Sequence, residues 1–276
     1  MSFDANQQLK RYAEDLVRAH QEEKQRSREL EAANQKLHVY AEELSTNLEK
    51  LKLAKEALQD SYLETIQKLV MAVEFKDEET GGHIQRMSHY SVLIALKLHM
   101  PPEMIFRLLH AAPMHDIGKI GIPDMILTKP ARLTPEEFAI IKTHTTIGAR
   151  ILADSRSDII RLAGEVALTH HEKWDGSGYP RGLKGNDIPI MGRIVALADA
   201  FDAITSARPY KAAFSVEHAC AIIEKDKGAH FDPQVADVFL EHMDIVRQIK
   251  DASEQDRELN FILSIRQNRD SHHDAE

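Results

Sequence analysis

Several features that define other classes of protein are missing from this chain of 276 residues. It has one cysteine, Cys220, so no disulfide can form within the chain, and the thiol fits a small buried apolar position. No run approaches the roughly 18 apolar residues of a membrane-spanning helix, and the polar N-terminus excludes a signal peptide. We therefore expect a protein of the reducing cytoplasm that is not inserted in a membrane.

Positive charge is also scarce. The chain has 35 Lys and Arg against 44 Asp and Glu, which gives a formal net charge of −9. This balance argues against nucleic-acid polymers and membrane surfaces as partners. An acidic protein that binds an anionic substrate must supply positive charge locally, either from metal ions or from a few well-placed Lys and Arg residues.

Glycine and proline are absent from the first sixty residues, where leucine recurs at every seventh position with one interruption at Glu23. The leucines of this column are Leu9, Leu16, Leu30, Leu37, Leu44, Leu51 and Leu58. The companion column is mixed and includes Asn34, a residue that favours dimers when it occupies a coiled-coil core. We predict that residues 1–63 form a long N-terminal helix that pairs as a parallel coiled-coil homodimer. The alternatives are a solvated single helix and a helix docked on its own domain.

The region from residue 64 to residue 250 has apolar residues at the three-and-four spacing of helices, and no strand pattern stands out. We predict an all-α domain there, followed by a charged tail over 251–276. Thr134-Pro135 has the character of a helix start, and the Gly-rich stretch 171–187 indicates a long ordered loop. The predicted helices are 64–76, 84–99, 102–113, 135–152, 157–169, 189–206, 215–227 and 233–248.

Histidines and acidic residues are more numerous in this domain than one metal ion requires. The candidate metal ligands are Glu79, His83, His115, Asp116, His144, His170, His171 and Asp199. Imidazole nitrogens and carboxylate oxygens are the ligands of hydrolytic metal centres. A set of this size can hold two or three ions, and a pair of ions clamps the attacking and leaving oxygens of a phosphoester displacement. The sequence therefore predicts a metal-dependent phosphohydrolase.

Each candidate also has a simpler interpretation when it is taken alone. On a helix, His115 and Asp116 would project about 100° apart, so Asp116 could bridge two ions, but the pair could equally cap a helix. His144, a lone histidine on an apolar face, is more often a hydrogen-bonded core residue. A carboxylate in an apolar helix, such as Asp199, needs a partner, which a metal or an arginine such as Arg193 or Arg208 would supply.

A few basic residues lie near these candidates in sequence. Lys119 lies one turn after His115 and could hold a substrate phosphate beside the metals. Arg208 and Lys211 follow the helix of Asp199 and could point back towards the metals, the alternative being an exposed basic turn. Arg86 could orient a carboxylate or contact phosphate.

Taken together, these motifs resemble those of the HD-GYP family, a branch of the HD superfamily of metal-dependent phosphohydrolases. The resemblance covers about residues 65 to 250, and the motifs stand in the family's order. They are Glu-Thr-Gly-Gly-His at 79–83, His-Asp-Ile-Gly-Lys at 115–119, His-His-Glu at 170–172, Gly-Tyr-Pro at 178–180, Asp-Ala-Phe-Asp at 199–202 and Arg-Pro-Tyr-Lys at 208–211. Departures are small: Met114 stands where Leu is commoner, and Ala131 where Gly is usual.

The resemblance implies an HD-type helical bundle with two or three divalent metal ions, iron or manganese. Family members hydrolyse the second messenger cyclic di-GMP to pGpG or on to GMP, by activating a bridging water or hydroxide. Carried over to this sequence, the ligands are the eight candidates above, and Glu79 and His83 belong to the version with a third metal. Hydrolysis of another cyclic dinucleotide or nucleotide phosphate, and a non-catalytic scaffold that binds cyclic di-GMP, are the competing interpretations.

The resemblance also implies roles outside the ligand set. Asp116, Lys119 and Asp202 match catalytic positions, and Asp202 corresponds to a residue near the attacking water. Lys119, Arg208 and Lys211 match phosphate-contacting positions. Gly178-Tyr179-Pro180 corresponds to a loop near the substrate pocket, which in some relatives contacts diguanylate cyclase domains.

Overall fold

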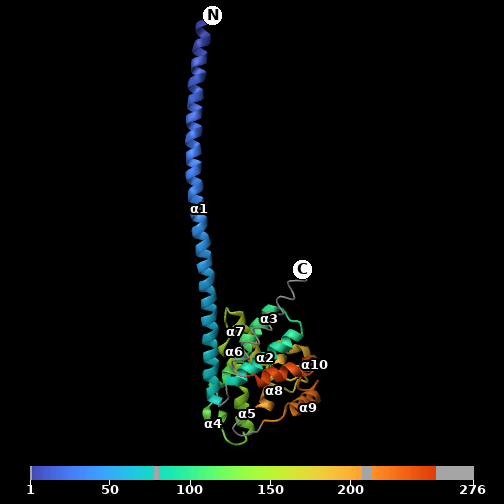
Figure 1. Ribbon diagram of the computed structural model, residues 1–276. Helices are drawn as coiled ribbons and strands as arrows, with labels where there is room; N and C mark the ends of the chain where they lie inside the picture. The colour runs from blue at the N-terminus through green and yellow to red at the C-terminus, as the bar shows by residue number, and fades with distance from the viewer. Residues whose placement is uncertain (1, 78–80, 207–212, 253–276) are drawn as a thin grey trace. The chain divides into compact units, whose positions relative to one another are not determined.

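The computed structural model describes residues 2–77, 81–206 and 213–252 of the chain (Figure 1). The chain divides into two compact units, residues 1–63 and the residues from Glu64 onward. Within the described residues the regular elements are all helical, and a single isolated bridge joins Lys227 and Phe231. The prediction of an all-α fold is therefore confirmed. No helix of the described part is long and apolar enough to cross a membrane.

The first unit consists of most of helix α1, which runs over Ser2–Glu74 for 73 residues. Its sequence has neither of the residues that interrupt helices, glycine and proline. All side chains described between residues 7 and 62 are exposed. The leucines of the heptad column are 61% to 75% exposed, so this unit carries an apolar stripe along its surface.

The second unit gathers the remaining helices around α2 and α8, which pack against each other (Figure 1). Tyr90 of α2, Phe201 of α8 and Phe239 of α10 are fully buried, with ring centroids 4.9 to 6.0 Å apart in edge-to-face contacts. The helices are α2 (Gly81–Lys97), α3 (Pro102–Ala111), α4 (Asp124–Leu127), α5 (Pro135–Lys142), α6 (His144–Ile151), α7 (Asp158–Thr169), α8 (Ile190–Thr205), α9 (Val216–Asp226), α10 (Pro233–Glu241) and α11 (Met243–Asp251).

Short 3₁₀ helices connect some of these elements. They are η1 (Phe75–Asp77), η2 (Ala112–Met114), η3 (Ile117–Gly121) and η4 (Gly185–Asp187). A second, smaller core includes Ile66 and Val70 from the last turns of α1, together with Met114 of η2 and Ala167 of α7. Because Met114 immediately precedes His115, this core fixes the backbone from which the His-Asp motif starts.

Two of the predicted helices are divided in the structure, so their predicted continuity was wrong. The predicted helix 135–152 breaks at Thr143, between α5 and α6, where the Ile141 carbonyl accepts a hydrogen bond from His144 Nδ1 at 2.7 Å. The predicted helix 233–248 breaks at His242, whose Nδ1 lies 2.8 Å from the Val238 carbonyl. In both places an imidazole takes a carbonyl that a continuous helix would use for its own ladder. The predicted start at Thr134 is confirmed, with a complete capping box.

Candidate metal centre

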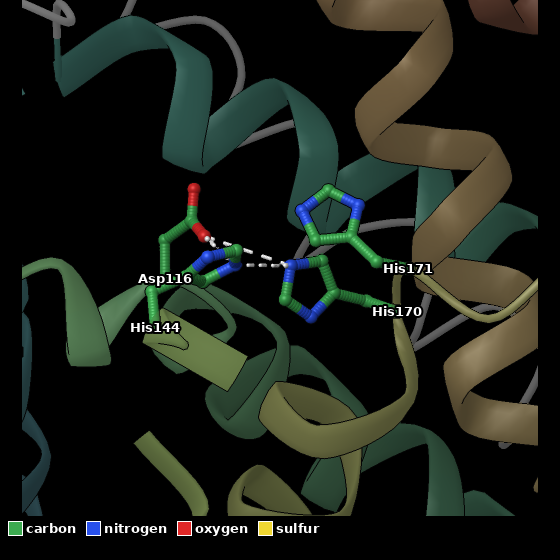
Figure 2. Close-up of side chains that lie close together, drawn as sticks. All are labelled: Asp116, His144, His170 and His171. Atoms are coloured by element: carbon green, nitrogen blue, oxygen red, sulfur yellow. Dashed lines mark hydrogen bonds and ion pairs between the residues drawn. The ribbon is translucent and has the colours of Figure 1, made fainter. Parts of the chain in front are cut away.

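The structure brings the candidate ligands that it describes into two groups. One group contains Asp116, His144, His170 and His171, and the other contains His83, His115 and Asp199. Within each group, one ligand atom from every residue lies within 4.8 Å of the others. Figure 2 shows the imidazoles of the first group facing one another beside the Asp116 carboxylate. Five separate parts of the chain therefore converge, as the ligand hypothesis requires.

Asp116 is the residue that joins the two groups. Its Oδ1 lies 3.2 Å from His144 Nε2 and 3.5 Å from His170 Nε2, in the first group. Its Oδ2 lies 3.2 Å from His115 Nε2, in the second group. The two oxygens of one carboxylate thus face different groups, which is the arrangement that a carboxylate bridging two ions needs.

The local backbone of the His-Asp motif differs from the helix considered above. His115 and Asp116 lie in the turn between η2 and η3, with φ and ψ of −102° and 10° at Asp116. Two residues later, Gly118 packs against α6 so closely that a Cβ there would lie 1.9 Å from the carbonyl oxygen of His144. The glycine of this motif therefore allows the chain segments of two ligands, Asp116 and His144, to touch.

The imidazole rings are held in place through their Nδ1 atoms. His115 Nδ1 lies 3.0 Å from the Ala112 carbonyl, and His170 Nδ1 lies 3.1 Å from the carbonyls of both Val166 and Ala167. His144 makes the equivalent contact with Ile141. A backbone carbonyl requires the proton on Nδ1, so Nε2 is left as a lone-pair donor facing the centre. This is the tautomer that binds a metal.

His83 is oriented by a carboxylate instead. Its Nδ1 lies 2.8 Å from Oδ2 of the fully buried Asp202. Arg86 donates to both oxygens of the same carboxylate, from Nε at 2.6 Å and from Nη2 at 2.7 Å, and Ser206 Oγ adds a bond at 3.1 Å. These contacts, with burial opposing them, lower the pKa of Asp202 to about 2. Asp202 is therefore an anionic anchor for His83 and Arg86, and Arg86 orients a carboxylate as considered above.

The residues present fit divalent metal ions. The buried Nε2 of His115 and Oδ1 of Asp116 have no hydrogen-bond partner among the described residues. Buried polar atoms without such a partner are costly, and metal coordination is one way of satisfying them. A set of imidazoles and carboxylates suits iron, manganese and zinc, while ligand type alone does not choose among them.

The charge balance of the centre also favours cations. Burial disfavours a charged His115, but Asp116, Asp199 and Glu74 outweigh it and raise the pKa of His115 to about 10. The local potential is thus negative and attracts cations. Burial lowers the pKa of His170, and it acts with the neighbouring imidazoles to lower the pKa of His171 further. Neutral imidazoles are the form in which histidine binds a metal.

Asp116 keeps its charge despite its surroundings. Burial acts to raise its pKa, but Lys119 and His115 hold the pKa of Asp116 well below its usual range. Lys119 Nζ lies 2.8 Å from Asp116 Oδ2. The predicted phosphate-binding lysine therefore lies directly at the centre, where it can contact an anion that reaches the metal ligands.

The Gly-Tyr-Pro loop lies against the same centre. The Tyr179 ring lies 4.8 Å from the His171 ring at an interplanar angle of 32°. A Cβ on Gly178 would lie 2.3 Å from the Lys173 amide nitrogen, so only glycine allows this close return of the loop, and the loop continues into Pro180. Tyr179 also donates its amide to the His171 carbonyl at 3.1 Å. The loop and the candidate ligand His171 therefore form one packed unit.

Two residues near the site were given no role from the sequence, although Glu172 belongs to the His-His-Glu motif. Buried Glu172 accepts hydrogen bonds from the amides of Arg181 and Leu183, at 2.7 and 2.9 Å, and closes the loop. Lys76 Nζ donates to the Ile120 and Ile122 carbonyls of η3 and its end, at 3.0 and 2.7 Å. The position of Glu172 directly after the His pair was a sequence signal for its role. Nothing in the sequence pattern indicated the role of Lys76.

Three predicted site residues lie outside the described residues: Glu79, Arg208 and Lys211. Arg208, one of the two arginines considered as partners for Asp199, is among these three. The other, Arg193, pairs elsewhere, because its Nη1 lies 2.5 Å from Oδ2 of Asp232. Asp199 instead has its Oδ1 3.6 Å from His83 Nε2, with its side chain 21% exposed.

Comparison with known proteins identifies the family of this chain. A model of the HD domain family matches residues 67–235, more than half of the chain. The chain is 51% identical over 197 residues to a cyclic di-GMP phosphodiesterase of Thermotoga maritima, covering 70% of this chain and 54% of that protein. It is 46% identical over 186 residues to a probable cyclic di-GMP phosphodiesterase of Vibrio cholerae, covering 62% and 42% of the two chains. A 3′3′-cGAMP-specific phosphodiesterase of the same bacterium is 40% identical over 208 residues, with 75% and 40% covered.

The chain thus spans about half, or less, of the length of these curated relatives. The matched region contains every described ligand of both groups. The chain therefore belongs to the HD domain family and, with its Gly-Tyr-Pro loop packed against the ligand His171, to the HD-GYP branch of that family.

Proposed function

We propose that this protein is a metal-dependent phosphodiesterase that hydrolyses cyclic di-GMP to pGpG or on to GMP. The observation that carries the proposal is the pair of ligand groups that share the Asp116 carboxylate. Relatives at 51% and 46% identity are named as known or probable cyclic di-GMP phosphodiesterases, which supports the choice of substrate. A soluble second messenger also fits a protein of the cytoplasm.

The metals proposed are two or three divalent ions, iron or manganese. Asp116, His144, His170 and His171 would hold one ion, and His83, His115 and Asp199 would hold the other, with Asp116 shared. Glu79, with His83, would serve a third. Such ions supply Lewis-acid stabilisation of the attacking and leaving oxygens of the phosphodiester.

The protein's own groups would bind and orient the substrate. The Lys119 ammonium, now paired with Asp116, can transfer its hydrogen bonds to a phosphate oxygen at the same place. Arg208 and Lys211 are proposed as further phosphate contacts. Asp202 acts indirectly, because both of its oxygens are engaged in holding His83 and Arg86.

A second candidate keeps this chemistry and changes the substrate to another cyclic dinucleotide. It is favoured by the relatives named 3′3′-cGAMP-specific phosphodiesterases, at 37% to 40% identity. The metals act on the phosphodiester, which all these substrates share, so the metal ligands do not separate the candidates. A non-catalytic scaffold is the third candidate, and the convergence of the seven candidate ligands that the structure describes weighs against it.

The test is hydrolysis of several cyclic dinucleotides, with identification of the products, by protein reconstituted with iron or manganese. We expect at least two metal ions per chain by elemental analysis, and turnover that depends on them. Asp116→Ala should lose metal and activity together, because its carboxylate faces both groups. Lys211→Ala should keep the metal but raise KM. A protein that binds no metal, and gains no activity from either ion, is not a phosphodiesterase of this kind.

We also propose that the heptad leucines pair α1 with α1 of a second copy in a parallel coiled coil. Their 61% to 75% exposure leaves an apolar seam that a second copy of the same helix would bury. Leu37→Lys with Leu44→Lys places charge in this seam and should reduce dimerisation in light scattering. The matched control is Gln35→Lys with Glu42→Lys, at the outward heptad positions, which should stay dimeric.

Deleting residues 1–58 should likewise reduce dimerisation and alter turnover while the metal content stays the same. A truncated protein that remains fully dimeric with unchanged turnover would make the helix a simple tether. Diguanylate cyclase domains, which would contact the loop of Gly178, Tyr179 and Pro180, are proposed as partners, and co-purification with such a domain would test this.

A further inference from the structure

Helix α5 presents an open aromatic surface although it is firmly anchored. Its start carries the capping box of Thr134 and Glu137, and Lys129 Nζ adds bonds to both oxygens of Glu137 at 2.7 Å. Yet within α5, which the structure describes throughout, no side chain is buried. Phe138 remains 45% exposed. A helix that is fixed in position and exposes an aromatic ring to solvent is suited to bind a ligand.

Phe138 belongs to a cluster of three side chains from two elements. Lys142 Nζ lies 4.8 Å from the centre of the Phe138 ring and 5.2 Å from that of Tyr179. The two rings lie 6.4 Å apart, nearly perpendicular to each other. Phe138 and Lys142 are one helical turn apart, so their contact alone would be an ordinary helix pair. The contact with Tyr179, from the Gly-Tyr-Pro loop, makes the cluster a tertiary feature.

This cluster adjoins the metal centre on two sides. Tyr179 packs against the ligand His171, with 4.8 Å between the rings. Lys142 precedes the ligand His144 by two residues, across the break between α5 and α6. Burial raises the pKa of Tyr179, and Asp116 adds to the effect, so the hydroxyl lies within electrostatic reach of the ligands and stays protonated. The cluster is therefore close enough to the metal centre for a base of a substrate bound there to reach it.

The chemistry of the cluster suits a nucleobase. Phe138, which is 45% exposed, offers aromatic surface on which a base can stack, and Tyr179, packed against His171, supports it from behind at 6.4 Å. The ammonium of Lys142 offers only donors. Guanine presents two acceptors on one edge, N7 and O6, whereas adenine presents the N6 amino donor where guanine has O6. A lysine ammonium that borders the exposed Phe138 ring thus favours guanine at the base edge and disfavours adenine.

We propose that Lys142, with Phe138 and Tyr179, forms a base-binding wall beside the metal centre that selects guanine over adenine. The proposal rests on the proposed function, since it assigns the base reader of the same phosphodiesterase site. Lys142 is then a specificity-determining residue of a cyclic dinucleotide hydrolase, and it acts on substrate choice through the base.

The experiment compares Lys142→Met with wild type on cyclic di-GMP, 3′,3′-cGAMP and cyclic di-AMP, with kcat and KM measured separately. We expect kcat/KM for cyclic di-GMP to fall about 10- to 100-fold, mainly through KM, since one base contact of this kind carries that much discrimination. The loss for cyclic di-AMP should be smaller, so the ratio of guanine to adenine activity should shrink. Lys142→Arg keeps donors for O6 and N7 and should retain the ratio.

Lys225→Met is the matched control. Like Lys142, Lys225 lies in the last turn of its helix, here α9. It is exposed, and replacing it with Met changes the net charge of the protein by the same amount. It should leave kcat, KM and the ratio unchanged. A Lys142→Met protein with normal metal content that loses all substrates equally, or loses none, would overturn the assignment. Failure of wild type to hydrolyse any cyclic dinucleotide would instead refute the proposed function, before any variant is compared.

Discussion

Gly118→Ala should abolish metal binding although it replaces none of the candidate ligands. The added Cβ would lie 1.9 Å from the carbonyl oxygen of His144 and 2.5 Å from the amide nitrogen of Gly148. An ordinary contact needs about 3.5 Å. Both obstacles are backbone atoms of α6, so no side chain can turn away, and η3 and α6 must separate by roughly 1.5 Å. Asp116 and His144 lie on opposite sides of that gap, with 3.2 Å between Oδ1 and Nε2.

Metal sites tolerate errors of only about 0.2 Å in ligand distance, so this displacement should abolish shared coordination by Asp116 and His144. We expect most of the metal to be lost by elemental analysis, and a loss of about 3 kcal/mol in the free energy of unfolding, the upper end for overpacking. The control is Gly164→Ala in the interior of α7, where the nearest atom to the new Cβ is 3.5 Å away. That variant should keep its metal and gain roughly 0.5 to 1 kcal/mol. A Gly118→Ala protein with full metal content and normal stability would refute the reasoning.

Two further predictions concern the buried carboxylates. Glu172→Gln should lower the free energy of unfolding, measured by urea denaturation, by about 1 to 2 kcal/mol and make the 173–187 loop easier to proteolyse. The reason is that the amide nitrogen of Gln cannot accept a hydrogen bond from the second backbone N–H. The control, Glu241→Gln at an exposed position, should leave the stability unchanged, and equal behaviour of the two variants would contradict the role of Glu172 in closing the loop. Asp202→Ala should destabilise the fold by about 3 kcal/mol or more, since it leaves Arg86 buried without its anion, and should lower the metal content through His83. If metal binding and stability both survive Asp202→Ala, the carboxylate is not the anchor.

Much of the site could be predicted from the sequence, because ligand chemistry is carried by residue type and motif order. The seven candidates that the structure describes do converge, including His144, which alone looked like a core histidine. The partners of the ligands could not be predicted in the same way. The contact of Arg86 with Asp202 joins residues 116 positions apart, and it depends on how α2 packs on α8. Helical periodicity says which face of a helix is apolar, but not which face of another helix meets it.

Several of the candidate ligands lie at helix ends, which explains why the sequence pattern missed the helix break at residue 143. His83 lies in the first turn of α2, His144 begins α6, and His170 follows the end of α7. At helix ends the backbone leaves the regular ladder, so carbonyls become available to anchor Nδ1, as Ile141 does for His144. A helix that ran unbroken through residue 143 would commit that carbonyl and turn the ring elsewhere. The break that periodicity missed is therefore part of what aims His144 at Asp116, and helix boundaries are where the sequence pattern is least informative.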